Sequence, residues 1–338
     1  MFDSPLEVQL ADAVYRPDAT SLRLAEALRS WDVGGTTIAR TFRETYDQLY
    51  DGMHTGRYRW DQLHKTEKTH FGTLIEINLR RALDGFLADG LVMDFKVHLP
   101  AVLRQGLPEV NAEVDCKFSQ TLYAWMIPNE ALGHWAMVCH ASDTDSTWSV
   151  GFVHITPKIL TKGGNRDQKR TIKKDGRTAV AWAWQDEPLP PNVLLQLPSE
   201  AAEYILEPSS GQQRVNRLFE EAVGSIVPRG TVETVAQQKD SMKRVRSSGG
   251  ARTALQPSGI IILGDYVFHR DVATKLGLPV PGAGDFISAY VARAKDFPTN
   301  PNRVFLEDDW WVVVSKDDVT GPAPTFGHKP TKQEASAF

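Results

Sequence analysis

The triplet Asp115-Cys116-Lys117 combines residue types that phosphate chemistry uses. In a β-strand, residues i and i+2 point to the same face, so the carboxylate would lie beside the ammonium group while Cys116 faces the other side. Mg²⁺ needs only one or two protein carboxylates besides phosphate oxygens and water. The lysine could then orient or help deprotonate the attacking water and stabilise charge on the phosphate. The triplet is therefore a candidate centre for metal-assisted hydrolysis of a phosphate ester.

Spacing alone gives this pattern little weight, because the same D-x-K spacing recurs at Asp94-Phe-Lys96 and Asp167-Gln-Lys169. Any one of the three could be an ordinary surface ion pair, with a contribution of about 0–1 kcal/mol. The setting of Asp115 is different, since it lies in the apolar stretch EVDCKF, and a charge near a core needs a partner or a function. Asp94, on a preceding predicted strand, could supply a second carboxylate.

A helix and several strands must position these groups. Apolar residues at helical spacing predict one buried stripe, formed by Ile75, Leu79, Ala82, Leu83 and Phe86. Glu76 lies beside this stripe, where it could bind a metal ion or a water molecule from the side. Strands are predicted at 91–97, 112–118, 134–141 and 148–155. A helix flanked by short strands favours an α/β layer with a mixed sheet.

Composition excludes several classes of protein. The chain has 338 residues, 41% of them hydrophobic, which suffices for a sizeable core and favours two domains. Its net charge of −4 excludes a bulk polycation, so nucleic-acid binding would need local basic patches. Two cysteines make neither a disulfide framework nor a zinc knuckle. Without a signal peptide or an apolar run of about 18–20 residues, a cytoplasmic protein is expected.

Prolines mark the expected domain boundary. The stretch QDEPLPPN (185–192) is predicted to be a stiff, extended linker. We therefore expect a first domain at 1–185, a linker at 186–191 and a second domain at 192–338, with a frayed tail after Gly321. The most regular helix of the chain is predicted from Val215 to Ile226, and it should end at Pro228.

Two basic segments are candidates for DNA contacts, although most charge runs are simply solvated faces. The first is 162–177, with Lys169 and Arg170. The second is 231–252, where two short helices and a glycine turn suggest a helix-turn-helix unit. Lysines would contact phosphates and arginines could read guanine. The candidates in this second segment are Lys239, Lys243, Arg244, Arg246 and Arg252.

Several distinctive motifs keep their order along most of the chain. They are DQLYDG (47–52), TGRYRWDQLHKTEKTHFGTLIEINL (55–79), VDCKFS (114–119), AWMIP (124–128), NRDQKR (165–170), ETVAQQKDSMKRVRSSGGAR (233–252), GIIILG (259–264) and LGLPVP (276–281). Within them, HKTEKTH and MKRVRSSGGAR are long and unusual. Together these motifs resemble those of the NaeI-type restriction endonucleases.

The resemblance implies an α/β fold: a PD-(D/E)xK nuclease-like mixed sheet flanked by helices, joined to a C-terminal winged-helix, CAP-like DNA-binding domain. It implies a Mg²⁺-dependent type II restriction endonuclease that makes double-strand cuts in palindromic DNA. A second copy of the DNA site, held by the C-terminal domain, would activate cleavage. The protein would be a homodimer, and a cognate DNA methyltransferase could act on the same site.

The same resemblance assigns roles to residues. The metal carboxylates would be Asp94, Asp115 and Glu76, the lysine would be Lys117, and Thr66 would support the site near the scissile phosphate. The stretch 96–111 is longer than the family pattern leads us to expect. A ligase-like YDG segment follows Leu49, where a ligase would carry its nucleophilic lysine, so lysine–adenylate chemistry is not expected.

Two other functions share these folds. One is a sequence-specific DNA-binding regulator built on an inactive nuclease fold, and the other is a nicking or strand-passing protein. The presence of Glu76, Asp115 and Lys117 favours the endonuclease.

Overall fold

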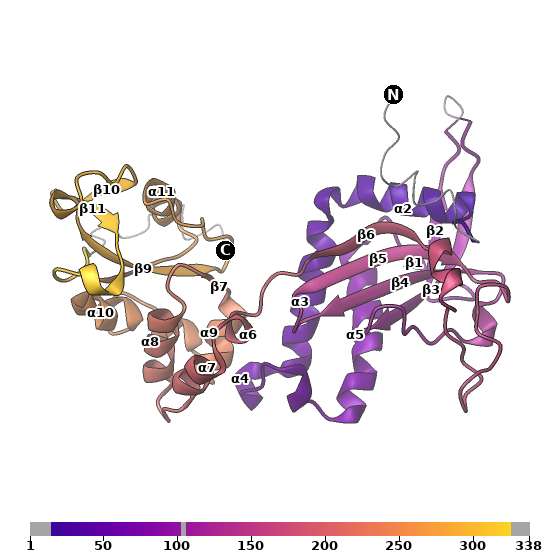
Figure 1. Ribbon diagram of the computed structural model, residues 1–338, viewed down its shortest axis with the longest axis horizontal. Coiled ribbons are helices and arrows are strands. Elements are labelled where there is room, and N and C mark those ends of the chain that lie inside the picture. The colour runs from indigo at the N-terminus through magenta and orange to yellow at the C-terminus, as the bar shows by residue number, and fades with distance from the viewer. Residues whose placement is uncertain (1–14, 103–105, 326–338) are drawn as a thin grey trace. The chain divides into compact units, whose positions relative to one another are not determined.

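The computed structural model describes residues 15–102 and 106–325 (Figure 1). The chain divides into two compact units. The N-terminal unit comprises Met1–Leu49 and Leu63–Pro191, and the C-terminal unit comprises Tyr50–Gln62 and Asn192–Phe338. Within the described ranges, no helix combines the length and apolar character that crossing a membrane requires.

One mixed sheet organises the N-terminal unit, as the sequence predicts. In the described residues its strands follow one another in chain order, and only β3 and β4 are parallel, so that the residues between them must cross over. Both faces of β4 and β5 are buried, which matches their nearly continuous apolar sequences. The strands are β1 (Ala88–Asp89), β2 (Phe95–Leu99), β3 (Val110–Ser119), β4 (Trp135–Ser142), β5 (Thr147–His154) and β6 (Ala181–Pro188).

Three long helices flank this sheet: α2 (Ala19–Trp31), α3 (Thr36–Tyr50) and α5 (Lys65–Ala82) (Figure 1). The α2 helix packs against β5 and β6. The Tyr46 hydroxyl of α3 donates to the Ala141 carbonyl of β4 at 2.8 Å. On α5, the centroid of the Phe71 ring lies 4.8 Å from the centroid of the Phe118 ring on β3. This aromatic contact fixes α5 over the strand that carries the Asp115-Cys116-Lys117 triplet.

A second sheet organises the C-terminal unit. Its long strand β9 pairs antiparallel with β7, β8 and β11, and β10 adds to β11. The strands are β7 (Ile226–Val227), β8 (Ile260–Leu263), β9 (Phe286–Arg293), β10 (Arg303–Leu306) and β11 (Asp309–Val313). The helices are α4 (Gly52–Thr55), α6 (Val193–Gln196), α7 (Ser199–Leu206), α8 (Gly211–Glu221), α9 (Arg229–Ala236), α10 (Ala251–Leu255) and α11 (Val267–Lys275).

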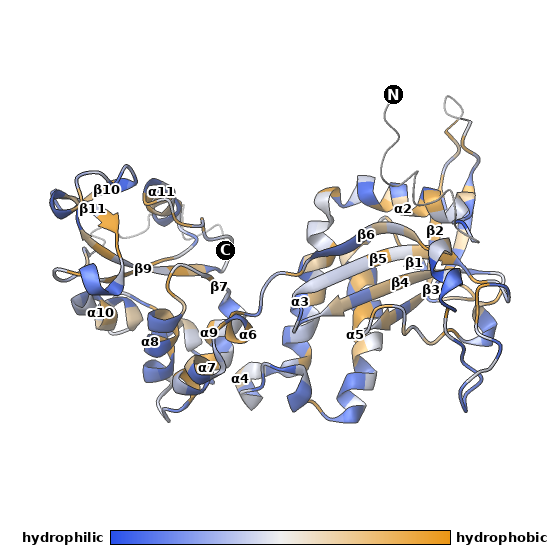
Figure 2. Ribbon diagram, viewed as in Figure 1, coloured by the Kyte–Doolittle hydropathy of each residue, from blue (hydrophilic) through white to orange (hydrophobic). Residues whose placement is uncertain are grey.

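The α8 helix shows how the core of this unit forms. Its buried residues include Val215, Leu218 and Phe219, whereas polar residues cover its other face, which is blue in Figure 2. Short 3₁₀ turns complete both units, at Val33–Gly35, Trp60–Gln62, Asn129–Ala131, Asp175–Ala179, Ser241–Arg244, Gln256–Ser258, Ala294–Asp296 and Lys316–Asp318.

The excursion Tyr50–Gln62 belongs to the C-terminal unit, although it lies between two helices of the N-terminal unit in the sequence. Buried Tyr58 is part of the same apolar cluster as Val193 and Leu194. The Asn192 side-chain amide donates to the Tyr58 carbonyl at 2.8 Å. A Cβ atom on Gly52 would come within 2.1 Å of the Thr234 hydroxyl oxygen, so glycine is needed for this close approach to α9. No pattern in the sequence indicated this excursion.

Several predicted elements need correction. Residues 186–188 of the predicted linker are the end of strand β6, which turns hydrophilic there (Figure 2). Residues 91–94 of a predicted strand form bends. The helix predicted from 215 to 226 ends at Glu221, because Gly224 adopts a φ of 78° and the chain then enters β7. Part of the predicted frayed tail is ordered: Ala323 is buried and its N–H donates to the Gln256 carbonyl at 2.8 Å. The rest of that tail, from 326 onward, lies outside the described residues.

Candidate active site

Strand β3 places Asp115 and Lys117 side by side, as the i, i+2 spacing predicts. The Lys117 ammonium nitrogen lies 2.5 Å from Asp115 Oδ1 and also donates to the Cys116 carbonyl at 3.1 Å. The Asp115 side chain is 8% exposed and that of Lys117 is 22% exposed. The pair is therefore largely withdrawn from solvent but still accessible from one side.

Asp94 joins this pair from the neighbouring strand. It directly precedes β2, where Phe95 pairs with Val114, so continuing the antiparallel register places Asp94 opposite Asp115. Asp94 Oδ2 accepts the N–H of Cys116 at 2.7 Å and lies 3.9 Å from the Lys117 ammonium nitrogen. Residues Phe95–Leu99 of β2 pair with Val110–Val114 of β3, and this pairing leaves Asp94 beside the triplet.

Glu76 completes the cluster from helix α5. Burial raises the pKa of its carboxyl group, the negative charge of Asp94 raises it further, and the positive charge of Lys117 lowers it. Glu76 is thus close enough to Asp94 and Lys117 for their charges to shift its pKa. The structure brings together Glu76, Asp94, Asp115 and Lys117, which come from one helix and two adjacent strands.

Burial dominates the electrostatics of Asp115. It raises the pKa of this carboxyl group from 3.8 to about 6, against the opposing effects of the Lys117 charge and hydrogen bond. Burial lowers the pKa of Lys117, but the nearby Asp115 outweighs this and the net shift is upward. The lysine is therefore charged at neutral pH and is the main compensation for the buried acidic group.

An unsatisfied oxygen indicates that this cluster fits a cation. Asp115 Oδ2 is buried and has no hydrogen-bond partner, which is costly for a carboxylate unless a positive charge completes it. The three carboxyl groups offer the hard oxygen ligands that Mg²⁺ prefers. In the described part of the chain, no three His, Cys, Asp or Glu side chains form a ready-made metal cage. A Mg²⁺ ion would thus depend on one or two of these carboxylates, with water and phosphate as its other ligands.

Thr66 is not part of this cluster in the structure. It is exposed in the first turn of α5, about 15 Å from Glu76 along the helix axis at 1.5 Å per residue. Its predicted supporting role near the scissile phosphate therefore stays a prediction.

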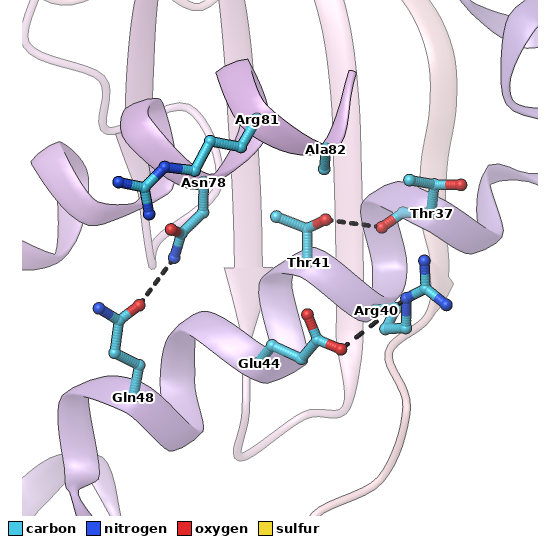
Figure 3. Close-up of a pocket in the computed structure, with 8 residues that line it drawn as sticks. All are labelled: Thr37, Arg40, Thr41, Glu44, Gln48, Asn78, Arg81 and Ala82. Atoms are coloured by element: carbon cyan, nitrogen blue, oxygen red, sulfur yellow. Dashed lines mark hydrogen bonds and ion pairs between the residues drawn. The ribbon is translucent and has the colours of Figure 1, made fainter. Parts of the chain in front are cut away.

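A polar cavity lies close by, but it is separate from the cluster. It measures about 400 Å³ and lies between α3 and α5 (Figure 3). Asn78 lines it, and a helix turns by about 200° over the two residues from Glu76 to Asn78, so the two side chains face different sides of α5. The lining residues are Thr37, Arg40, Thr41, Glu44, Gln48, Asn78, Arg81 and Ala82.

Glu113 is a site-associated residue that the sequence analysis missed. It lies two residues before Asp115 on β3, and its carboxylate accepts backbone N–H groups from the loop that precedes Asp94. Burial raises the pKa of Glu113, but these hydrogen bonds outweigh it and the net shift is downward. The signal available in the sequence was its i−2 position, which puts it on the same strand face as Asp115.

The predicted DNA-contacting residues of the C-terminal unit fall into two groups. Lys239, Lys243 and Arg246 are exposed between α9 and α10. Arg244 donates through Nε to the Gln238 side chain at 2.7 Å, and Arg252 donates through Nε to the Ile262 carbonyl at 3.0 Å. Burial lowers the pKa of Arg252. These hydrogen bonds give Arg244 and Arg252 a structural role within the C-terminal unit. A role in reading DNA bases would not by itself account for these bonds.

In the N-terminal unit, Lys169 and Arg170 lie in a polar loop. The Asn165 side-chain oxygen accepts the N–H of Lys169 at 2.9 Å, and the Arg170 guanidinium donates to the Asn129 side chain at 3.2 Å. The Lys169 side chain is exposed and remains available for a phosphate.

Comparison with known proteins places this arrangement in a family. Residues 22–322 match the family model described as "Restriction endonuclease NaeI". The chain is 41% identical over 320 residues to the type II restriction enzyme NaeI of Lentzea aerocolonigenes, covering 93% of this chain and 96% of that protein. The carboxylates and the lysine described above lie within the matched residues. The chain therefore belongs to the NaeI restriction endonuclease family and is a site-specific endonuclease.

Proposed function

We propose that the N-terminal unit cuts both strands of palindromic DNA with the help of Mg²⁺. The support is the convergence of Glu76, Asp94, Asp115 and Lys117 around a buried carboxylate oxygen that lacks a partner. When bound, Mg²⁺ would supply charge stabilisation at the phosphate and lower the pKa of coordinated water.

Each side chain then has a distinct task. Asp94 and Asp115 would hold the cation, and Glu76 would complete or orient its surroundings. Lys117 orients the attacking water and stabilises the charge that builds up on the phosphate oxygens. As the water oxygen loses a proton and bonds to phosphorus, the bond from phosphorus to the 3′ oxygen breaks and that oxygen takes up a proton. The products are a 5′-phosphate and a 3′-hydroxyl end.

The two units suit a PD-(D/E)xK nuclease and a winged-helix domain. The β2–β3 hairpin carries Asp94 and the D-x-K triplet next to the parallel strand β4, with helices flanking the sheet. In the C-terminal unit, the chain runs through α8, β7, α9, α10, β8, α11 and β9 in that order, and β9 lies between β7 and β8 in the sheet. A helix-turn-helix followed by a small antiparallel sheet is typical of winged-helix DNA-binding domains.

We further propose that the enzyme is a homodimer that cuts one copy of its site and is activated by a second copy held through the C-terminal unit. Lys239, Lys243 and Arg246 would contact phosphates of that second copy. A coupling of about 1–3 kcal/mol would make DNA with a single site a poor substrate. A methyltransferase that modifies the same sequence would be the expected partner in the cell.

Digestion of supercoiled plasmids with Mg²⁺ tests the catalytic assignment. The unaltered protein should give linear DNA, whereas Asp115→Ala and Lys117→Ala should leave the plasmid uncut. Asp167→Ala is the matched control, because Asp167 belongs to a D-x-K triplet of identical spacing in an exposed loop. The control should cut like the unaltered protein.

The same experiment separates the alternatives. Relaxed circles as the final product would indicate a nicking or strand-passing protein. Specific binding without cleavage, for plasmids that together contain many palindromes, would indicate a DNA-binding regulator. Full activity of Asp115→Ala would remove the proposed active site altogether.

A further inference from the structure

Glu113 makes an unusual set of hydrogen bonds with the loop that leads to Asp94. Its Oε2 atom accepts the backbone N–H groups of Leu91, Val92 and Met93, each at 3.1 Å. Three consecutive N–H groups thus converge on one carboxylate. Charge-assisted bonds of this kind are stronger than bonds between neutral groups.

Little else fixes the tip of this loop. Leu91 is 86% exposed and Val92 is 66% exposed, so neither side chain is anchored in a core. The loop is closed at its base by the N–H of Gly90, which donates to the Asp94 carbonyl at 3.3 Å. Met93, at the end of the loop, is half-buried and packs against an apolar core cluster. The path of the backbone at the tip, from Gly90 to Val92, therefore depends mainly on the Glu113 carboxylate.

Gly90 shows how tightly the loop fits around Glu113. A Cβ atom at this position would lie 2.0 Å from the Met93 carbonyl oxygen and 2.9 Å from Glu113 Oε2. The first distance involves a backbone atom that cannot move without changing the loop. Any residue other than glycine would therefore shift either the loop or the carboxylate.

Asp94 is the next residue after this loop, and its carboxylate must meet the Cys116 N–H at 2.7 Å. We propose that Glu113 is a positioning residue: it contacts neither DNA nor metal, but it holds Gly90–Met93 so that Asp94 lies beside Asp115 and Lys117. This inference rests on the proposed role of Asp94 as a cation ligand. Glu113 would thus affect cleavage only through the placement of Asp94.

The test compares Glu113→Gln with Glu109→Gln in the full chain. Glutamine keeps the shape of the side chain, but loses the negative charge and one acceptor oxygen. Glu109 is the matched control, because it is a nearby glutamate whose carboxylate contacts the side chains of Asn111, at 2.8 Å, and His98, at 3.5 Å, rather than the loop before Asp94. Hydrogen exchange of the amides of 91–93 and calorimetric titration with Mg²⁺ without DNA are measured alongside cleavage.

In Glu113→Gln, we expect protection of these three amides to fall at least about tenfold and Mg²⁺ affinity to fall about 10- to 100-fold, as for other residues that orient metal ligands. Excess Mg²⁺ should restore much of the cleavage rate, which a general loss of structure would not allow. Glu109→Gln should match the unaltered protein in all three measurements. Unchanged amide protection or unchanged Mg²⁺ affinity in Glu113→Gln would overturn the inference.

Gly90→Ala perturbs the same loop without altering Glu113, and it decides the question if Glu113→Gln does not fold. It should reproduce the weaker Mg²⁺ affinity, and unaltered affinity in this variant would count against the inference. Asp94→Asn separates this inference from the proposed function. If Asp94→Asn cuts normally, the proposed site is wrong; if it is inactive while Glu113→Gln binds Mg²⁺ normally, only the positioning role is wrong.

Discussion

The carboxylate of Asp94 accepts the backbone N–H of Cys116 at 2.7 Å. Asp94 is therefore held by the main chain of the same triplet whose side chains, Asp115 and Lys117, it faces. The distance between Asp94 and Asp115 is therefore set partly by a backbone hydrogen bond and not only by contacts between flexible side chains. Because the bond uses only one of the two carboxylate oxygens, the other stays available for a ligand.

Asp94→Asn should separate the structural part of this arrangement from the chemical part. The amide oxygen can still accept the Cys116 N–H, but the negative charge is lost. We expect cleavage to slow by about 10²–10³-fold, comparable to the loss of one charge-stabilising group, with little change in melting temperature. Single-turnover cleavage and thermal unfolding check this. A variant that both cuts and melts normally would show that the Asp94 charge is not used.

The raised pKa of Asp115 predicts how stability of the metal-free protein depends on pH. The folded pKa of about 6 exceeds the ordinary value of 3.8. Between these values the folded state binds more protons than the unfolded state, so the free energy of unfolding should fall as pH rises from about 4 to about 6. Asp115→Asn should lose this contribution. Urea unfolding of both proteins across this window measures it, and parallel curves would contradict the pKa shift.

The contact of α5 with the sheet should depend strongly on Phe71. The centroid of this fully buried ring lies 4.5 Å from that of the Tyr46 ring and 4.8 Å from that of the Phe118 ring. Phe71→Ala should cost about 3–5 kcal/mol of stability and loosen the helix that carries Glu76. Thr73→Ala, at an exposed position of the same helix, is the control and should be close to neutral. Chemical denaturation followed by tryptophan fluorescence would detect the difference.

Exposed basic residues should govern DNA affinity at the C-terminal unit. Lys243→Ala or Arg246→Ala should weaken binding to specific and nonspecific DNA alike. Each should lower the slope of log affinity against log salt by about 1, as expected for one lost phosphate contact. Lys275→Ala is the control, since Lys275, like Lys243, is exposed and paired with a neighbouring aspartate but lies on α11, outside the basic segment. Fluorescence anisotropy at several salt concentrations measures both quantities, and equal slopes for all variants would contradict the assignment.

The sequence predicted which acidic and basic side chains lie together better than it predicted the loops around them. Asp115 and Lys117 share a face because strand periodicity is a local property, and the strand was recognisable from its apolar residues. Asp94 was a candidate second carboxylate because it lies on a preceding predicted strand, and the family resemblance named it as a metal ligand. Its pairing with Asp115 could not be derived from local pattern, since about twenty residues separate them. The role of Glu113 could not be foreseen, because it depends on backbone N–H groups about twenty residues away in the sequence.

Fold elements were missed where local patterns compete with long-range packing. Strand β9 is the centre of its sheet, yet its sequence FISAYVAR shows no clear alternation, because nearly every residue in it is buried. The linker residues 186–188 read as proline-rich and extended, and they join the sheet through β5. Extended conformation was thus foreseen, while the hydrogen-bonded partner was not.

The assembly of the C-terminal unit from two separate stretches of chain limits how the protein can be divided. A fragment of residues 192–338 would lack Tyr58, which lies in its apolar core, and Asn192 would lose the carbonyl that accepts its amide. Circular dichroism of this fragment should therefore show reduced cooperativity of unfolding. Adding a peptide of residues 50–62, or grafting it through a new connection, should restore a sharp transition. Expression boundaries placed only after Pro191 would thus truncate one folded body rather than separate two.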